Sequence, residues 1–171
     1  FLYLMTTTTR DYLIEQVRSG NVLIFSKLQT LNQGDTEYYF IENPEDNGLI
    51  EIESISTTAG TRTDVNIHTN VTVDTEGDDM HVINSRVGDV EDIGLTRTYG
   101  GAYSDLDAEP FEDIIPGGEG GSSGPAGNVV GGIGRDVSLS IPAGENVLLE
   151  FVNSSSSDGY IAPRFLINVV K

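Results

Sequence analysis

Apolar and polar residues alternate along most of the chain in short segments, the pattern of β-strands that bury one face. Leu49 to Ile55 places Ile50, Ile52 and Ile55 on one face. Arg62 to Asp74 alternates over a longer stretch, with the apolar positions Val65, Ile67, Val71 and Val73. The segment 21–31 alternates around Val22, Ile24 and Leu28. Further strands are predicted over 36–43, 80–84, 93–99, 137–141, 147–152 and 161–170.

Two of the predicted hairpins resemble each other although they lie far apart in the sequence. In the first, an apolar strand ends at Asn43, a polar turn follows over 44–48, and a second strand begins. In the second, the strand ends at Asn153 and the polar turn covers 154–159. Early and late hairpins meet in one sheet in Greek-key and jelly-roll folds. We therefore predict an all-β fold, a jelly-roll-like antiparallel β-sandwich spanning 21–171.

The first twenty residues differ from the rest and predict a short helical arm over 1–20. Thr8 or Thr9 can cap a helix, Asp11 suits its first turn, and Gly20 ends it after Arg18. An apolar stripe on this helix is predicted from Tyr12, Leu13 and Val17. A helix this short needs a docking surface. It either covers one end of the sandwich or, together with the apolar segment 1–5, packs on a neighbouring subunit.

The segment from Gly100 to Gly134 is rich in glycine and predicts a long exposed loop within the sandwich domain. Apolar side chains occur inside it at Phe111, Ile114 and Ile115. Apolar residues in such a loop indicate contact with another surface. Two alternatives remain open: the loop folds back on the sandwich, or it grips an adjacent subunit.

The net charge of −18 changes this picture, because it comes from 27 acidic residues against nine basic ones. Only Lys27 and Lys171 are lysines. Self-repulsion of this size is screened in molar salt, where the Debye length falls to ~3 Å. Acidic excess and scarce lysine together favour a protein from a halophile, and we expect the fold to loosen at low salt. The same charge argues against nucleic-acid binding. The absence of an apolar run of transmembrane length argues against membrane insertion.

Searches for catalytic chemistry give negative predictions. The chain has no cysteine, which excludes thiol nucleophiles and Cys-ligated zinc. His68 and His81 have no neighbouring histidine at metal-ligand spacing, and no G-x-S-x-G motif is present. A single histidine on the polar face of a strand is usually solvated. We therefore predict no catalytic residue, no metal ligand and no cofactor.

Two weaker candidates for binding are present. The acidic turn over 74–79 is similar in composition to a calcium loop but lacks the spacing and flanking helices of an EF-hand. Tyr99 and Tyr103 flank the start of the glycine-rich segment and are the candidates for stacking on a sugar ring. Paired glycosidase carboxylates cannot be picked out among so many acids, and the glycine pairs precede no helix that would bind phosphate.

Several of these elements together resemble a family of virion proteins. They are the strand Tyr38-Tyr39-Phe40-Ile41-Glu42-Asn43-Pro44, the central glycine-rich loop, and the C-terminal stretch from Ile141-Pro142-Ala143-Gly144 to Asn153. This order resembles the β-sandwich head-decoration, vertex and tail-associated proteins of tailed phages. With the acidic composition, the chain resembles a structural protein of a haloarchaeal virus, a group that also builds capsids from small jelly-roll subunits.

The resemblance implies homo-oligomers about a three- or five-fold axis, contact with other virion proteins, and no catalysis. It transfers no individual functional residues. We therefore expect a structural protein of the virion, as a capsid, vertex or turret, decoration or tail-associated subunit. The alternative is a carbohydrate- or receptor-binding β-sandwich module on a fibre or on the cell surface of a halophile, with a host glycan or receptor as partner. A small secreted enzyme is a third, less favoured reading.

Overall fold

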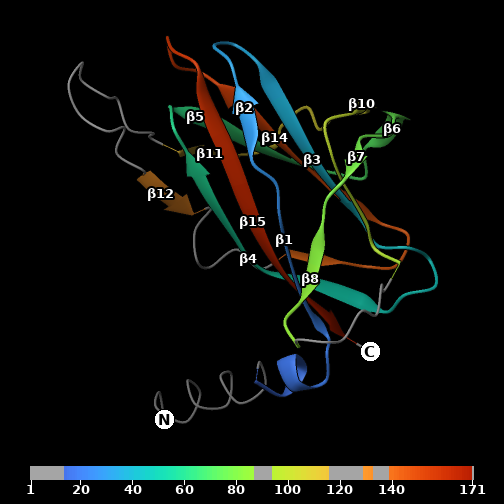
Figure 1. The fold of residues 1–171 in the computed structure, drawn as a ribbon. Coiled ribbons are helices and arrows are strands. Elements are labelled where there is room, and N and C mark those ends of the chain that lie inside the picture. Colours follow the sequence, from blue (N-terminus) through green and yellow to red (C-terminus); the bar gives the residue numbers. More distant parts are fainter. Residues whose placement is uncertain (1–13, 87–93, 116–128, 133–138, 171) are drawn as a thin grey trace, which may run out of the picture.

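The computed structural model describes residues 14–86, 94–115, 129–132 and 139–170. Two antiparallel sheets pack against each other (Figure 1), which confirms the predicted all-β sandwich. The first sheet has the order β12 (Val129–Gly132), β4 (Leu49–Ala59), β15 (Gly159–Val170), β1 (Val22–Ser26) and β8 (Val82–Asn84), with β13 (Leu139–Ile141) paired to β4 and β2 (Gln29–Leu31) paired to β15. The second sheet has the order β11 (Phe111–Ile115), β5 (Thr63–Thr69), β14 (Asn146–Asn153), β3 (Thr36–Glu42), β9 (Thr96–Tyr99) and β7 (Asp78–Asp79). A separate pair consists of β6 (Thr72–Thr75) and β10 (Ala102–Ser104).

The strands are wound as a jelly roll. The early strands β1 and β2 pair with the late strand β15, and β3 pairs with β14. Further in, β4 pairs with β12 and β13, and β5 pairs with β11. Each pair thus joins an outer segment of the sequence to the matching segment from the other end, which is the double Greek key of a jelly roll. The segment 70–110 is an insertion between β5 and β11.

Aromatic and β-branched side chains from both sheets fill the space between them. Phe25 stacks on Phe165 with ring centroids 4.9 Å apart. Tyr39 meets Phe151 edge to face at 5.4 Å, an arrangement that adds to the burial of apolar area. All four side chains are at most 2% exposed. The core therefore lies between the two sheets, on the face of β4 where the predicted alternation places Ile50, Ile52 and Ile55.

Asn43, which follows β3, is completely buried and bonds to two segments of backbone. Its Nδ2 donates to the carbonyl of Gly48 at 2.8 Å, which closes the turn between β3 and β4. The same group donates to the carbonyl of Ile141, the last residue of β13, at 2.9 Å. The backbone of Asn43 bonds to the turn that leads into β14, accepting from Gly144 N and donating to Glu145 O.

Asn153, at the end of β14, repeats this arrangement in the other half of the molecule. Its Nδ2 donates at 2.9 Å to Ser157 in the following turn and to Leu31, the last residue of β2. Its backbone accepts from Gly34 N and donates to Asp35 O. Each half therefore completes the other, and the resemblance between the two hairpins reflects a structural repeat. Gly34 and Gly144 have matching φ values of 77° and 78° in the equivalent turns.

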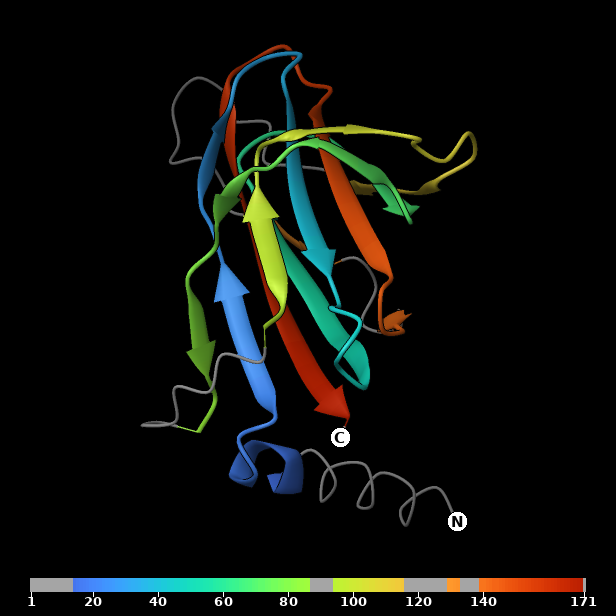
Figure 2. The same ribbon diagram turned by 90° about the vertical axis from the view of Figure 1, so that its right-hand side faces the viewer.

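The predicted helix is confirmed over its described part, residues 14–18. Gly20 has a φ of 75°, and its N–H donates to Val17 O while Asn21 N donates to Gln16 O. These two bonds form a Schellman motif, the usual way in which glycine ends a helix. Figure 2 shows the helix below the start of β1, and Asn84 of β8 donates to Gly20 O there. Of the predicted apolar stripe, Val17 is half-buried; Tyr12, Leu13 and the capping residues Thr8, Thr9 and Asp11 lie outside the described residues.

The alternation expected over 21–31 holds only in part, since Val22 is 1% exposed but Ile24 is partly exposed. Leu23 and Phe25 point into the core opposite Ile167 and Phe165, whereas Leu28 is 62% exposed between β1 and β2. Four consecutive apolar residues at 22–25 fit either face, so alternation alone does not decide between them. The cross-strand partners on β15 decide it.

The predicted single strand over 62–74 is also wrong. The chain turns at Asn70, which has a φ of 53°, between β5 and β6. Val65 and Ile67 are in the core, but Val71 belongs to a second apolar cluster and Val73 is 41% exposed. Asparagine tolerates the left-handed backbone conformation, which allows this turn within an alternating sequence.

The range 100–134, predicted as one loop, contains the strands β10, β11 and β12. Residues 116–128 and 133–134 of this range lie outside the described residues. Ile115 is buried in the core, whereas Phe111 and Ile114 are 52% and 51% exposed. Pairing of β11 with β5 brings this segment back onto the sandwich. The prediction treated the whole range as one glycine-rich loop, although residues 102–116, which contain β10 and β11, have no glycine.

We predict that Asn43→Ala and Asn153→Ala each lower the free energy of unfolding by about 2–4 kcal/mol, because each leaves two buried carbonyls without their donor. Chemical denaturation in molar salt measures this. The control is Asn32→Ala, whose exposed amide bonds only to Asp35 Oδ2 at 2.7 Å. A loss of stability no larger than that of the control would contradict the role of the two buried asparagines.

Candidate functional site

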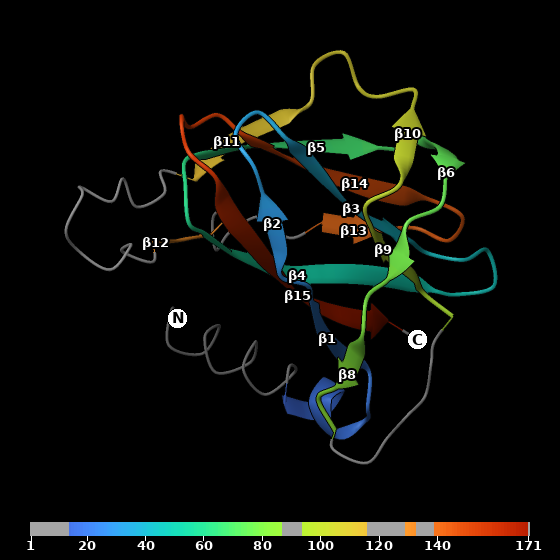
Figure 3. The ribbon, with the colours of Figure 1, turned by 45° about the horizontal axis from the view of Figure 1, so that its top comes forward.

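The insertion between β5 and β11 covers part of the outer face of the second sheet. We call β6, β10 and residues 105–110 the flap. Figure 3 shows β6 and β10 beside β3 and β14. A small apolar cluster holds the flap in place, formed by Phe40, Val71 and Leu148 with Tyr38 and Tyr103 packed against it. Because an antiparallel sandwich usually has a solvated outer face, this second core marks the flap as an added layer.

His68 lies under the flap and is only 3% exposed, so its prediction as a solvated residue is wrong. The backbone N–H of Asp107 donates to Nδ1 at 3.2 Å, which assigns the ring proton to the other nitrogen. Nε2 then donates to Glu150 Oε2 at 3.3 Å. Both ring nitrogens are engaged, so the ring holds the flap on the sheet and offers no free nitrogen to a substrate.

Glu150 is the centre of the polar network beside the apolar cluster. Asn66 Nδ2 donates to Oε2 at 2.7 Å, and the hydroxyl of Tyr38 donates to Oε1 at 3.3 Å. Burial and the neighbouring Glu150 carboxylate together raise the pKa of Tyr38 above its ordinary range. The alternation of β5 and β14 places Asn66 and Glu150 on the outer face of the sheet. No pattern in the sequence indicates that a distant loop covers them.

The two tyrosines predicted as a sugar platform are in different environments. Tyr103 packs inside the cluster, stacked on Phe40 at 5.3 Å and edge-on to Tyr38 at 5.5 Å, so its ring is not available for stacking. Tyr99 lies half-exposed on β9, with the Lys27 ammonium 4.6 Å from its ring centroid. Of the predicted pair, only Tyr99 lines an open cleft.

This cleft of about 480 Å³ lies between the acidic turn and the glycine pair at 100–101. It is lined by Gln29, Glu37, Thr75, Glu76, Gly77, Asp78, Tyr99, Gly100, Gly101 and Ala102. Backbone approaches backbone so closely here that a Cβ on Gly77 would lie 2.3 Å from Tyr99 O, and one on Gly101 2.7 Å from Thr75 O. Both positions therefore require glycine. The walls present carboxylates, an amide and one aromatic ring, which are groups that bind hydroxyl-rich molecules.

The acidic turn over 74–79 contributes Glu76 and Asp78 to this cleft, and Asp74 accepts from Ser104 Oγ at 2.9 Å in the flap. Within the described ranges, no three His, Asp or Glu side chains lie close enough to hold a metal ion. His81 is exposed just before β8. A second cleft of about 600 Å³ lies beside β11 and is lined by Arg62, Asp64, Asn66, Glu112, Asp113, Ile114 and Val152.

Comparisons with known proteins assign neither a family nor a function. No protein-family model and no curated protein matches the chain. The infectious bursal disease virus VP2 subviral particle aligns at 14% identity over 85% of this chain and 41% of that chain, with a TM-score of 0.11. A structure of the Gx strain of the same virus aligns at 13% identity over 85% of this chain and 42% of that chain, also with a TM-score of 0.11. The chain thus spans about two fifths of the length of these proteins, and a TM-score this low does not establish a shared fold.

In the described part of the chain, no helix is long and apolar enough to cross a membrane.

Glu37 gives a pH prediction. Burial raises the pKa of Glu37, and hydrogen bonds from the backbone of Tyr38 and Gly100 oppose this. A carboxyl whose pKa is raised by folding favours the folded state below its unfolded pKa, and this contribution is lost as the pH rises through the folded value. We therefore predict that Glu37→Gln becomes progressively more stable than the wild type as the pH rises from about 4 to about 7. Thermal melts at fixed molar salt measure this, and Glu76→Gln, an exposed acid of the same cleft, controls for the change in net charge. Parallel pH profiles for the two variants would contradict the prediction.

Proposed function

We propose that this chain is a structural subunit of the virion of a halophilic virus and acts by assembling into homo-oligomers. It serves as a capsid, vertex or turret, decoration or tail-associated subunit. The observation that carries the proposal is the position of its exposed apolar side chains. Ile83, Phe111 and Ile114 are each more than half exposed and lie on the edge strands β8 and β11. Although β8 is short and β11 also carries Glu112 and Asp113, bulky apolar groups exposed at the edges of a sheet favour contact with another molecule.

The fold is compatible with this function without requiring it. Jelly rolls occur in viral capsid proteins, in lectins and in metal-binding cupins. A cupin needs a cluster of metal ligands on neighbouring strands, and the described residues provide no such cluster. Since one fold hosts many functions, the exposed apolar edges carry more weight than the topology.

The proposed function depends on rigidity and on solubility in brine. The reciprocal bonds of Asn43 and Asn153 fix the two halves of the sandwich against each other. The net charge of −18 keeps free subunits apart at low salt, and molar salt screens this repulsion over ~3 Å, which permits close packing of copies.

We predict that the purified chain forms a closed homo-oligomer in molar salt, because the apolar edges are buried only when copies associate. Size-exclusion chromatography with light scattering gives the mass. The same measurement at low salt is expected to show dissociation or loss of the fold. A single monomeric species at high protein concentration in molar salt would overturn the proposed function.

The alternative function, a module that binds a host glycan or receptor, has one specific observation in its favour. The cleft beside Tyr99 combines a half-exposed aromatic ring with Glu37, Glu76 and Gln29. Sugar-binding sites pair an aromatic face with hydrogen-bonding groups in this way. The Lys27 ammonium over the ring narrows the surface left for stacking.

If the cleft binds glycans, Glu76→Gln and Tyr99→Ala are expected to lower binding on a glycan array at least tenfold. Glu76 is exposed, so its substitution leaves the fold intact, and Leu106→Ala in the flap is the matched control outside the cleft. Absence of glycan binding by the wild type, or equal binding by all variants, would exclude a sugar site here.

A further inference from the structure

The acidic residues are distributed unevenly over the sandwich. The chain contains 27 Asp and Glu, yet β1, β8 and β15 contain none. These strands are adjacent in the first sheet, in the order β15-β1-β8. We call their outward side chains the acid-free face. It is bordered on β4 by Glu51 and Glu53, so the change from acidic to acid-free occurs between neighbouring strands.

A row of aliphatic side chains crosses the acid-free face. Ile24 of β1 is the direct partner of Ile83 on β8 and of Leu166 on β15. Leu23 and Phe25 point into the core, so these three side chains point outward. Ile83 is 59% exposed, while Ile24 and Leu166 are partly exposed. The row ends at β8, and within the described ranges no strand pairs with the far side of β8.

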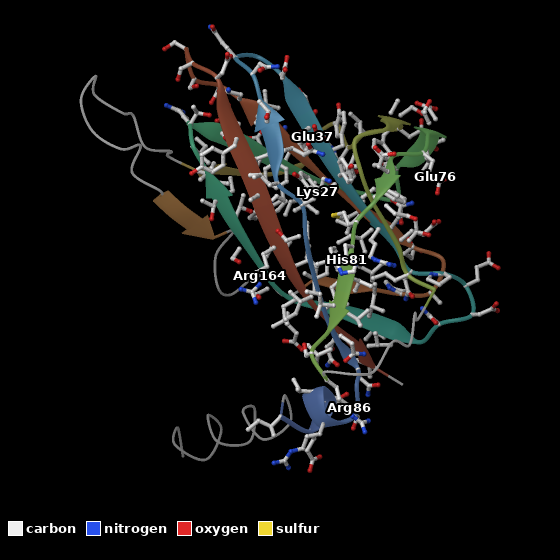
Figure 4. The ribbon with its side chains drawn as sticks, viewed as in Figure 1. Lys27, Glu37, Glu76, His81, Arg86 and Arg164 are labelled. Atoms are coloured by element: carbon white, nitrogen blue, oxygen red, sulfur yellow. The ribbon has the colours of Figure 1, made fainter. Side chains whose placement is uncertain are left out.

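Basic groups surround this row. Arg164 is exposed on β15, and His81 and Arg86 are exposed at the two ends of β8 (Figure 4). Across the register, Arg164 is the partner of Ser26, next to the aliphatic row. In a molecule of net charge −18, strands that carry arginine and no carboxylate of their own attract acidic surfaces, although the Glu53 carboxylate of β4 reaches this face by accepting from Asn168 Nδ2 at 3.5 Å.

The opposite side of the sandwich provides an acidic surface of matching character. The edge strand β11 exposes Phe111 and Ile114, at 52% and 51%. Glu112 and Asp113 lie between them, and Asp64 of β5 is the direct partner of Ile114. The second cleft runs along this edge. Ile114, flanked by carboxylates on the outer face of this edge, complements the aliphatic row flanked by arginines on the acid-free face, whereas Phe111, opposite the core residue Ile67, projects from the other face of the strand.

The two surfaces are on opposite sides of the molecule. In the second sheet β11 is the terminal strand at one end, and in the first sheet β8 is the terminal strand at the other. The contact between β11 and β12 aligns the two sheets, so the β11 and β8 edges face away from each other (Figure 1). One copy can therefore offer each surface to a different neighbour.

We propose that the acid-free face of one copy docks on the β11 edge of the next copy, in a head-to-tail contact. This inference rests on the proposed homo-oligomer and names its interface. Charge selects this contact over the symmetrical one, because pairing two β11 edges would bring Glu112 and Asp113 against their own copies. A repeated head-to-tail contact forms a ring when its rotation closes, as required for a three- or five-fold assembly.

The test uses two variants that each disable one surface. Ile83→Asp places a charge in the aliphatic row, and Ile114→Asp places one on the β11 edge; both sites are solvent-exposed, so the fold tolerates them. Val73→Asp, at a 41% exposed position on the flap, is the matched control. By light scattering in molar salt, each edge variant alone is expected to be a monomer, and the control to keep the wild-type mass.

The equimolar mixture of the two edge variants distinguishes the proposed contact from others. Ile83→Asp keeps its β11 edge and Ile114→Asp keeps its acid-free face, so the mixture is expected to form a dimer that cannot grow. A mixture that stays monomeric, or a single variant that retains the wild-type mass, would overturn the head-to-tail contact. If either variant melts below the control, Arg164→Glu and Glu112→Arg replace the pair: each alone is expected to be a monomer, and the mixture is expected to associate beyond a dimer, because the two reversed charges also complement each other.

Failure of this inference is distinguishable from failure of the proposed function. A wild type that is monomeric in molar salt contradicts both. A wild-type oligomer that survives Ile83→Asp and Ile114→Asp contradicts the docking surfaces and leaves assembly standing.

Discussion

The reciprocal hydrogen bonding of Asn43 and Asn153 is the constraint on which the rest of the sandwich depends. Each asparagine is buried and donates both to its own turn and to the end of a strand in the other half. Buried carbonyls without donors are costly, so neither half is complete alone. The pairing places β3 beside β14 and β4 beside β15, which are the inner strands of both sheets. The outer strands pair with these inner strands, and the flap packs on the outer face of the second sheet.

The positions of the charged side chains depend on which strands are central and which lie at the edges of the two sheets. Strands near the centre of a sheet are flanked by strands on both sides. Strands at the lateral edges are exposed to solvent on one side, and their outward side chains are either acidic or apolar. In this molecule the strands differ: carboxylates gather beside β11 and on β7, which consists of Asp78 and Asp79, whereas β8, β1 and β15 have none. For solubility alone, an even distribution of negative charge would serve equally well.

Sequence predicted the fold class because alternation was clear where a strand has one buried face. Ile50, Ile52 and Ile55 were placed correctly, and the extra residue between Ile52 and Ile55 matches the irregular register between β4 and β15. The alternation expected in β1 holds only in part because 22–25 are all apolar, and the partner that selects Leu23 and Phe25 is over a hundred residues away. The strands β10 and β11 were missed because the glycine-rich composition of 100–134 was extended over residues 102–116, which contain no glycine.

The candidate sites were less predictable than the fold, since they depend on contacts across the insertion. The alternation of β5 placed His68 on the outer face, but only the return of the chain at Asp107 buries it. Tyr99 and Tyr103, similar in sequence context, separate because one joins the cluster with Phe40 and the other faces the cleft. Neither outcome is encoded by spacing. The resemblance to virion proteins remains a prediction that awaits the oligomer measurements.

The placement of β15 has a consequence for synthesis in the cell. This strand pairs with β1, β2 and β4 and so forms the middle of the first sheet, although it occupies residues 159–170. A ribosome that has delivered the first hundred residues has therefore made strands whose central partner does not yet exist. The nascent chain must keep Phe25 and Ile52 from aggregating until that partner emerges, because contacts of such long sequence separation form late.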